Sequence, residues 1–492
     1  MKISKSYAFQ SFAIVLMATG FFLVFKTYLP KKIFKESESK NKHIVVDSLL
    51  LEAFEEEKDA RQKGLNLSET DSLTSVDSLS TILSDEPANT FRGFVYMHAF
   101  YEKLYQLEVE QKGKVRIAYY GDSMTDGDMI VQDLRRDFQN KYGGQGVGFV
   151  SVTSESAGSR SSISHQFSAN WKVQSYLNVK NPIKPFGING HVFFAKDTVN
   201  STWVRYKSSA NSHLSVLNKP TLFYGKSNNT KGQLRLIIGK DTLIKRLNPV
   251  GELNTLTLSE SNLKGFKADF IQADSIPFYG VNFDDQQGVH VDNFSNRGNS
   301  GLPLTTFKPG IMNQFQQKLG YQLIILHYGT NVLNYGSYNY SWYERQMSRV
   351  VENLRNCFPG VSILVVSTAD KATKYDLTMQ TDSAVSPLVS AQRKYAIANQ
   401  TGFVNLYQLM GGDGSMVKWV EDIPAKANKD YTHFNHRGAK QVSTMIFKQL
   451  EEGYEAYKKG KTGLVQPAEP VVVKPKAKDT IKVKRKENLN VH

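Results

Sequence analysis

The chain has 492 residues and a formal net charge of +15, and 40% of its residues are hydrophobic and 11% aromatic. This composition excludes a wholly disordered chain, and the length allows more than one domain with a substantial core. The single cysteine, Cys357, excludes an internal disulfide and any cysteine-based metal or redox motif, and we expect a buried structural thiol. No nucleic-acid-binding motif accompanies the positive charge, so we expect no nucleic-acid partner.

An uncharged, apolar run between Lys5 and Lys26 dominates the N-terminus. About twenty helical residues span roughly 30 Å, the hydrocarbon thickness of a bilayer. No small-x-small cleavage motif follows, so we predict an uncleaved transmembrane signal anchor over residues 6–26, with residues 1–5 in the cytoplasm. Lysines flank this segment on both sides and do not fix its orientation. Residues 27–90, rich in Ser, Asp, Glu and Lys, are predicted to form a linker, helical in part between 45 and 58.

From residue 91 onward, apolar segments typical of buried strands alternate with amphipathic segments typical of helices. This alternation predicts an α/β domain in which helices cover both faces of a parallel sheet, in two parts, 91–157 and 286–459. Ile130, Leu134 and Phe138 share one helix face, and Gly143 and Gly144 end that helix. The predicted strands are 115–120, 323–326, 362–366 and 402–405, and the other predicted helices are 91–109, 342–357, 384–398 and 437–457.

Residues 158–285 break this pattern. They are rich in Ser, Thr, Asn and aromatic residues, and they contain short alternating runs at 192–194, 202–206 and 233–238 with turn residues between them. This pattern predicts an inserted β-sandwich.

The C-terminal segment, residues 460–492, is predicted to be a disordered basic tail. Its Pro, Val and Lys content gives no amphipathic pattern, and a lysine-rich stretch runs from Lys474 to Lys486. Such a tail favours contact with an anionic lipid or an anionic polymer. A solubilising tail without any partner is an equal alternative.

The first chemical motif is Gly121-Asp122-Ser123, at the end of the predicted strand 115–120. The carboxyl ends of parallel strands are where open α/β folds bind ligands, which makes Ser123 a candidate nucleophile. Taken alone the motif is weak, because a helix N-cap at Ser123 or Thr125 explains it equally well.

The second motif, Asp430-Tyr431-Thr432-His433, precedes the last predicted helix. A serine hydroxyl needs a base that takes its proton, and histidine is the usual base near neutral pH. A carboxylate on the far ring nitrogen fixes the tautomer, and Asp430 is close enough in sequence to His433 to serve. A capping Asp beside a surface His is the alternative for this tetrapeptide alone.

The third element is a set of donors for an oxyanion, whose developing charge preorganised hydrogen bonds stabilise. Asn331 follows the predicted strand 323–326 and offers a side-chain amide at the same sheet edge. Gly298-Asn299-Ser300-Gly301 offers backbone N–H groups without obstructing side chains. Each of these alone is also typical of ordinary turns.

Together the blocks resemble the SGNH (GDSL-type) hydrolases, in chain order and in their placement at strand ends. The resemblance implies a flavodoxin-like three-layer fold with Ser123 as nucleophile, His433 as base and Asp430 as its orienting carboxylate. It also implies an oxyanion hole formed by the Ser123 N–H, Gly301 and Asn331, with Gly298 as the alternative glycine. Met124 stands where many members of the family have leucine. The matching blocks are 121–123, 296–301, 329–331 and 430–433.

A narrower resemblance to bacterial cell-wall O-acetylesterases covers residues 91–458. It rests on the motifs at 122–128, 143–149, 367–370, 410–416 and 430–438 and on Trp419. That group carries a carbohydrate-module-like β-domain between the serine and glycine blocks, and its members are exported. The resemblance implies a serine O-acetylesterase whose substrate is an acetylated wall or surface glycan and whose body is extracytoplasmic, in the bacterial periplasm or at the cell surface. Related peptidoglycan O-acetyltransferases make acyl transfer to a sugar the alternative, and a non-catalytic glycan-binding scaffold is a third.

Two further residues are candidates for the substrate pocket, Asp122 beside the serine and Trp419 beside Gly411 and Gly412. A packing role explains Trp419 equally well. Asp126, Asp128 and His436 together would suit a metal phosphoesterase, but a solvated helix start is the better interpretation, so we expect no metal and no cofactor.

Overall fold

The computed structural model describes residues 12, 16–17, 47–62, 86–196, 201–209, 215–333, 335 and 339–462. The chain divides into two compact units, 1–46 and 47–492, and the description below concerns the second. Most of the predicted anchor, 6–26, and most of the predicted tail, 460–492, lie outside the described residues. Among the described helices, none is long and apolar enough to cross a membrane.

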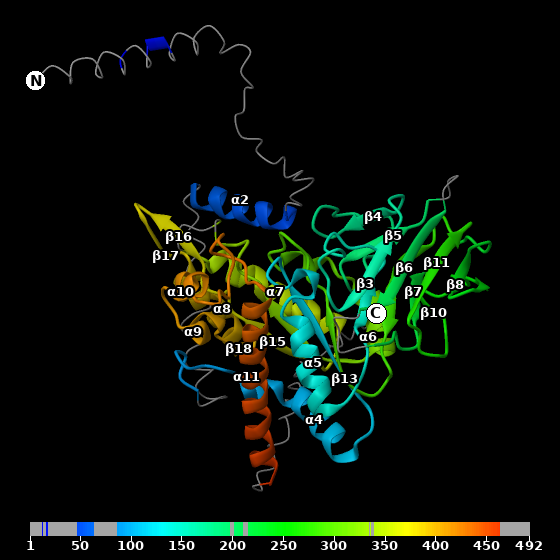
Figure 1. The fold of residues 1–492 in the computed structure, drawn as a ribbon. Helices are drawn as coiled ribbons and strands as arrows, with labels where there is room; N and C mark the ends of the chain where they lie inside the picture. Colours follow the sequence, from blue (N-terminus) through cyan, green and yellow to red (C-terminus); the bar gives the residue numbers. More distant parts are fainter. Residues whose placement is uncertain are drawn as a thin grey trace, which may run out of the picture. The chain divides into compact units, whose positions relative to one another are not determined.

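A five-stranded parallel sheet lies at the centre of this unit (Figure 1). Its order is β13-β1-β14-β15-β18, and every neighbouring pair is parallel. Numbered by their own order along the chain, these strands run 2-1-3-4-5, which is the flavodoxin-like arrangement. The strands are β1 (Lys114–Gly121), β13 (Gly288–Asn293), β14 (Tyr321–His327), β15 (Ser362–Val366) and β18 (Gly402–Val404).

Nearly every residue of these strands is buried, on both faces of the sheet. Burial on both faces explains why the strands are continuous apolar runs in the sequence. In the register, Ile117 of β1 pairs with Val291 on one side and with Leu323 on the other. Because the strands are parallel, their carboxyl ends meet at one edge, where Gly121 pairs with His327.

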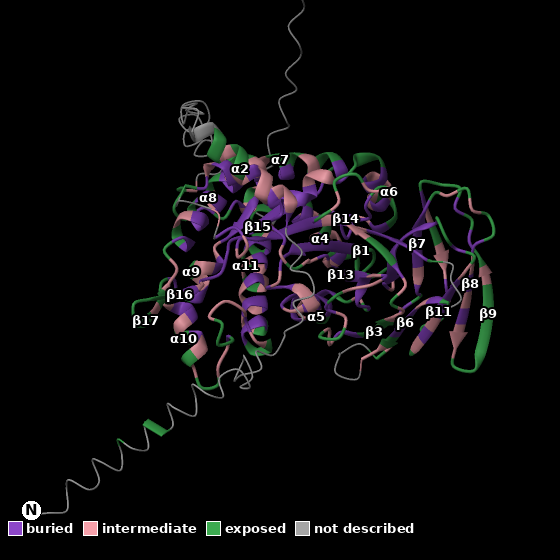
Figure 2. Ribbon diagram, turned by 90° about the horizontal axis from the view of Figure 1, so that it is seen from above, coloured by how far each residue is buried: buried purple, intermediate pink, exposed green. Residues whose placement is uncertain are grey.

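Helices cover both faces of the sheet. Helix α11 packs against α4 and α5, and these three helices cover one face, while α6, α7 and α8 form the layer on the other (Figure 2). The described helices of this unit are α2 (Ser48–Gln62), α4 (His98–Glu110), α5 (Val131–Tyr142), α6 (Pro309–Leu319), α7 (Ser341–Cys357), α8 (Val385–Ala398), α9 (Leu406–Met410), α10 (Ser415–Glu421) and α11 (His436–Thr462), with the 3-10 helices η1 (Phe94–Met97), η2 (Asp126–Asp128) and η3 (Leu302–Thr306).

A two-sheet antiparallel β-sandwich is inserted between α5 and β13. One sheet has the order β10-β7-β12-β5-β4 with β2 added on β12, and the other has the order β3-β6-β11-β8-β9. Buried apolar side chains from both sheets form a separate core between them. The strands are β2 (Gly148–Ser151), β3 (Ile163–Phe167), β4 (Lys172–Ser175), β5 (His191–Phe194), β6 (Thr202–Ser208), β7 (Thr221–Gly225), β8 (Gln233–Ile238), β9 (Asp241–Arg246), β10 (Leu253–Thr257), β11 (Gly265–Ile271) and β12 (Pro277–Phe283), and a separate hairpin joins β16 (Ala372–Tyr375) to β17 (Thr378–Thr381).

The predicted elements of the α/β part are present, with ends that differ by a few residues. The predicted helix at 91–109 is the least accurate, because it consists of η1 followed by α4. The helix that contains Leu134 and Phe138 ends at Tyr142, as predicted from the glycines that follow it. Gly143 has a positive φ of 75°, which glycine adopts readily. Cys357 is fully buried at the end of α7, as predicted.

Two predicted boundaries need correction. The predicted start of the sandwich at residue 158 leaves out β2, which pairs with β12 and therefore belongs to the sandwich. The predicted linker, 27–90, contains α2, which packs against α7 and η3 (Figure 2). Leu50 and Ala53 of this helix are 3% and 8% exposed, so a linker is the wrong description for residues 47–62.

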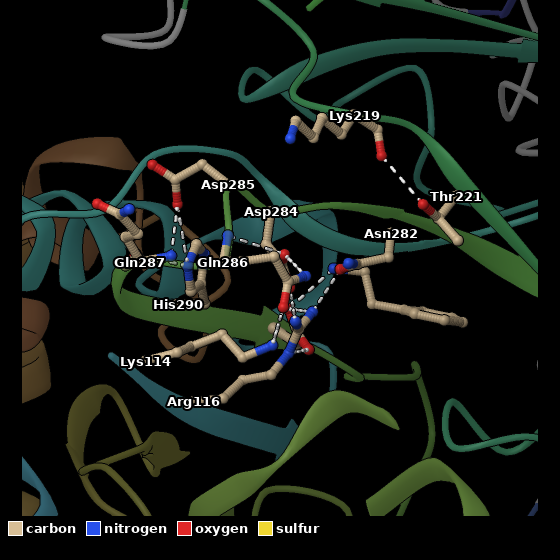
Figure 3. Close-up of polar contacts among 12 residues, drawn as sticks. Lys114, Arg116, Lys219, Thr221, Asn282, Asp284, Asp285, Gln286, Gln287 and His290 are labelled. Atoms are coloured by element: carbon tan, nitrogen blue, oxygen red, sulfur yellow. Dashed lines mark hydrogen bonds and ion pairs between the residues drawn. The ribbon is translucent and has the colours of Figure 1, made fainter. Parts of the chain in front are cut away.

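A buried ionic network joins the sandwich to the central sheet. Arg116 of β1 is 0% exposed, and its guanidinium donates to Asn282 at 2.6 Å, to Asp292 at 2.7 Å and to Asp284 (Figure 3). Asp292 lies in β13, whereas Asn282 and Asp284 lie in and directly after β12 of the sandwich. The network therefore spans the point at which the chain returns from the insert.

The charges in this network compensate one another. Burial acts to raise the pKa of Asp284, but Arg116 above all holds it well below its usual range. Asp292 also accepts a hydrogen bond from the backbone N–H of Phe149 at 2.8 Å and one from the hydroxyl of Tyr321. Since each charge is paired and hydrogen-bonded, loss of one partner would leave the others buried and uncompensated.

We expect Arg116→Met to destabilise the protein by about 3–5 kcal/mol, because it leaves buried Asp292 without its counterion and Asp284 with only Lys114, at 3.7 Å. The control is Lys226→Met, which removes an exposed ion pair to Glu252 at 3.1 Å and should cost about 1 kcal/mol or less. Urea unfolding of both purified variants measures the difference. Equal unfolding free energies for the two variants would contradict the role assigned to the network.

Candidate active site

Ser123 lies in a turn directly beyond the carboxyl end of β1. The turn is tight, because a Cβ on Gly121 would approach Thr125 Oγ1 to 2.2 Å, so only glycine fits there. The Ser123 side chain is half-buried, and helix α5 begins only at Val131. Ser123 and Thr125 are therefore not N-caps of α5.

Asp430 and His433 lie in the loop between α10 and α11. The loop is closed by a β-bridge between Ala427 and Phe434, and the Asn428 N–H donates to the His433 carbonyl at 2.8 Å. The Asp430 Oδ1 accepts the His433 N–H at 2.9 Å, which folds the tetrapeptide back on itself. This local turn holds the carboxylate beside the imidazole.

The structure brings the serine and the histidine, 310 residues apart in sequence, into hydrogen-bond contact. Ser123 Oγ lies 2.9 Å from His433 Nε2, and Asp430 Oδ2 lies 2.8 Å from His433 Nδ1. If Nδ1–H donates to the carboxylate, Nε2 is free to accept the serine proton, which is the arrangement of a Ser-His-Asp triad. The His433 and Asp430 side chains are 38% and 49% exposed, so water reaches the site.

The charge on Asp430 is stabilised locally. Burial acts to raise its pKa, but hydrogen bonds from the backbone and ring of His433 and from the Thr432 N–H lower it below the usual range. Asp430 is therefore ionised at neutral pH and is a ready acceptor for the Nδ1 proton.

Asn331, in the loop after β14, points toward the same region. Its Nδ2 donates to the Asn299 carbonyl at 3.1 Å and to Asp122 Oδ2 at 3.3 Å. These contacts place the amide between the serine turn and the glycine loop 296–301. The three predicted blocks therefore converge at the carboxyl edge of the sheet.

The two candidate glycines differ in what their N–H groups contact. The Gly301 N–H donates to Asn299 Oδ1 at 2.9 Å, and Gly301 is buried. In the described part of the chain, neither the Gly298 N–H nor the Ser123 N–H has an acceptor. In the structure Gly298, the alternative glycine, has an N–H that could donate to an oxyanion. The Gly301 N–H could do so only if the Asn299 side chain moved away.

The contacts that the asparagines of the glycine loop make with Tyr176 were not predicted from the sequence. The Asn299 Nδ2 donates to the hydroxyl of Tyr176 at 2.9 Å, and Tyr176 comes from the insert, directly after β4. The adjacent Asn296 donates to the same hydroxyl at 3.2 Å. The repeated asparagines of the glycine loop were a visible signal, whereas nothing in the sequence marks Tyr176 among the other tyrosines.

The remaining predicted residues are placed as follows. Trp419 is 3% exposed and packs against Phe434 at 5.4 Å between ring centroids, which fits the packing role and fixes Phe434, the residue after His433. Asp128 pairs with Arg135 and Arg160, Asp126 pairs with Arg297, and His436 begins α11. Within the described residues no group of three His, Cys, Asp or Glu side chains is arranged to hold a metal ion.

Asp122 is a buried carboxyl next to the triad. It is 1% exposed, and its Oδ1 accepts the Met124 N–H at 2.9 Å. Burial raises the pKa of Asp122 to about 6, and the Met124 N–H, His433 and Asn331 offset only part of that effect. Because the folded pKa exceeds the unfolded value of 3.8, this group destabilises the folded state as pH rises from about 4 to about 6.

We therefore expect Asp122→Asn to gain stability relative to the natural protein as pH rises. The difference in unfolding free energy between the two proteins should shift by up to about 3 kcal/mol in favour of the variant between pH 4 and pH 7. Denaturant unfolding at several pH values measures this shift. A difference that stays constant with pH would show that Asp122 titrates at its ordinary pKa.

No protein-family model matches the sequence, and neither does any curated protein. Among solved structures the chain is similar to a peptidoglycan O-acetylesterase, with a TM-score of 0.58 and 21% identity over 73% of this chain and 96% of that one. It is also similar to an acetyl xylan esterase (TM-score 0.26, 15% identity, 32% of this chain and 80% of that one). A third is a family two carbohydrate esterase from Cellvibrio japonicus (TM-score 0.25, 9% identity, 60% of this chain and 98% of that one).

The last two likenesses have TM-scores too low to establish a shared fold. The first likeness establishes the fold, because it extends over nearly the whole of the peptidoglycan O-acetylesterase. The chain therefore has an SGNH-like fold, and in this it resembles that O-acetylesterase.

Proposed function

We propose that the protein is a serine esterase that removes O-acetyl groups from a cell-wall or surface glycan. The hydrogen-bonded chain Ser123–His433–Asp430 is the observation that carries the proposal. A serine bonded to the far nitrogen of a carboxylate-oriented imidazole is what nucleophilic catalysis at an ester requires.

In the first half-reaction Ser123 Oγ attacks the acetyl carbonyl while His433 Nε2 takes the hydroxyl proton. The carbonyl oxygen becomes an oxyanion. When it collapses, the ester C–O bond breaks and His433 gives the proton to the sugar oxygen, which leaves as a hydroxyl. In the second half-reaction His433 removes a proton from water, which attacks the acetyl-enzyme. The bond between the acyl carbon and Ser123 Oγ then breaks, His433 returns the proton to Oγ, and acetate leaves.

The oxyanion requires donors, and three groups near Ser123 are the candidates. These are the Ser123 N–H, a backbone N–H of the glycine loop and the Asn331 amide. Asn331 at present donates to Asp122 at 3.3 Å and to the Asn299 carbonyl at 3.1 Å, so its amide lies between the serine turn and that loop, and the longer bond to Asp122 would have to give way to the oxyanion. Preorganised donors of this kind lower the barrier by several kcal/mol in total.

The substrate class rests on the fold shared with a peptidoglycan O-acetylesterase and on the position of the insert. The insert contacts the glycine loop directly through Tyr176, so a glycan held by the sandwich would lie close to Ser123. The exposure of His433 supports access of water to the acetyl-enzyme. Transfer of the acetyl group to a sugar hydroxyl would use the same residues and is the alternative outcome.

We also propose that the body is extracytoplasmic and held at the membrane by residues 6–26. The uncharged run in that segment supports this proposal, and so does the nature of the substrate. The basic segment 460–492 would then meet anionic lipid or anionic wall polymer.

Ser123→Ala should lower acetate release from an acetylated glycan and from p-nitrophenyl acetate by at least about 1,000-fold, because it removes the atom that forms the acetyl-enzyme. A fluorophosphonate should label the natural protein and not this variant. The matched control is Ser259→Ala in the sandwich, whose hydroxyl bonds locally to the Ser261 backbone: it donates to the carbonyl at 2.9 Å and accepts from the N–H at 3.1 Å. Undiminished turnover by the Ser123 variant would disprove the mechanism, and an unlabelled natural protein would favour a non-catalytic scaffold.

A second measurement decides between water and sugar as the acyl acceptor. With p-nitrophenyl acetate as donor, we expect free acetate to be the main product even when an unacetylated glycan is added. Mass spectrometry of that glycan would reveal transferred acetyl groups. Predominant acetylation of the glycan would identify an O-acetyltransferase.

EDTA should leave acetate release unchanged, because every step of this mechanism uses side chains and water alone. Assays with EDTA, and with EDTA followed by added divalent ions, test this. Loss of activity that metal ions restore would instead favour a metal-dependent esterase.

A further inference from the structure

The start of helix α2 contacts the glycine loop of the candidate active site. Asp47 is 2% exposed, and its Oδ2 accepts the Ser300 backbone N–H at 2.9 Å and also the Ser300 hydroxyl. The same carboxylate caps α2, because Oδ1 accepts the N–H groups of Leu49 and Leu50, each at 3.1 Å. One buried side chain thus joins the helix to a loop 253 residues away in sequence.

The helix that carries Asp47 is docked along its length. Phe54 packs edge-on against Tyr335 and Trp342, with ring centroids 5.7 Å and 6.3 Å apart. Glu57 accepts from Arg345 of α7 at 2.6 Å, and the Ser48 N–H donates to the Leu177 carbonyl of the insert at 3.1 Å. Figure 2 shows α2 beside α7. Asp47 is therefore held in place by a helix fixed to both parts of the body.

Ser300 lies between Asn299, whose carbonyl contacts the Asn331 amide, and Gly301, a predicted oxyanion donor. On one side, the Asn299 carbonyl accepts the Asn331 amide at 3.1 Å, and on the other side Gly301 has a positive φ of 94°. The Ser300 carbonyl itself accepts the hydroxyl of Tyr343 at 2.8 Å. Side chains therefore contact the loop at several points. Asp47 is the carboxylate that holds Ser300, and Asp126 pairs with Arg297 of the same loop at 2.6 Å.

We propose that Asp47 is a positioning residue for the glycine loop, 296–301. The segment that follows the predicted membrane anchor is then part of the active-site scaffold. This inference rests on the proposed esterase function. Asp47 touches no reacting atom. It fixes Ser300, Ser300 fixes the Asn299 carbonyl, and that carbonyl orients the Asn331 amide toward the serine turn. Small displacements of such donors reduce transition-state stabilisation far more than substrate binding.

Asp47→Ala in the full chain, solubilised in detergent, should lower kcat for p-nitrophenyl acetate at least about tenfold and change KM less than about twofold. The rate is expressed per active site, counted by stoichiometric fluorophosphonate labelling, so that unfolded protein does not contribute. Asp47→Asn keeps the side-chain shape but one acceptor oxygen instead of two, and it should give a smaller loss. A kcat per labelled site equal to that of the natural protein in both variants would overturn the proposal.

Glu57→Gln is the matched control, because it weakens the docking of the same helix at Arg345 without touching the loop, and its kcat should be unchanged. An equal fall in kcat in this variant would mean that docking of α2 in general matters and would overturn the specific role of Asp47. A double-mutant cycle of Asp47→Ala with Ser300→Ala should show losses that are not additive, since both variants remove the hydrogen bond from the Ser300 hydroxyl to Asp47. Additive losses would also overturn it.

Ser123→Ala, measured alongside, separates the two proposals. An inactive Ser123 variant with a fully active Asp47→Ala variant rejects only the positioning role. A fully active Ser123 variant rejects the esterase function and the positioning role together.

Discussion

The arrangement of the central sheet and the inserted sandwich depends on the ion pairs of the buried Arg116 guanidinium. Arg116 lies in the central sheet and is bonded to Asp292 of the same sheet and to Asp284 at the end of the sandwich. A charge so far from water is stable only with both carboxylates in place, which fixes the path of the chain as it leaves the insert. The sandwich is thereby held against the sheet, and its Tyr176 reaches the glycine loop.

The site itself follows from the parallel sheet. Parallel strands put their carboxyl ends at one edge, so the turns after β1, β13 and β14 are neighbours although the insert separates the first two by more than a hundred residues. Asn331 then bridges the first and second of these turns through Asp122 and the Asn299 carbonyl. The loop that carries Asp430 and His433 is fixed by its own β-bridge and by the packing of Phe434 on Trp419.

The N-terminal helix α2 contacts the candidate site directly through Asp47. Asp47 caps its own helix with one oxygen and holds Ser300 with the other, so ordering of the helix and ordering of the loop are linked. Burial raises the pKa of Asp47, while the hydrogen bonds from Ser300, Leu50 and Leu49 act in the opposite direction. The helix begins at Ser48, about twenty residues after residue 26, the end of the predicted anchor, so the predicted anchor and the helix that contacts the loop are close in sequence.

The sequence by itself determined the parallel α/β class, the presence of the inserted sandwich and the candidates Ser123, Asp430, His433 and Asn331, because burial on both faces and strand-end chemistry leave local patterns. Only the tertiary structure decided which glycine N–H is uncommitted, since that depends on the side-chain direction of Asn299. The same holds for β2, α2 and Tyr176, whose partners lie far along the chain. Sequence periodicity reports the face an element buries, whereas the partner it meets is set by the packing of the whole molecule.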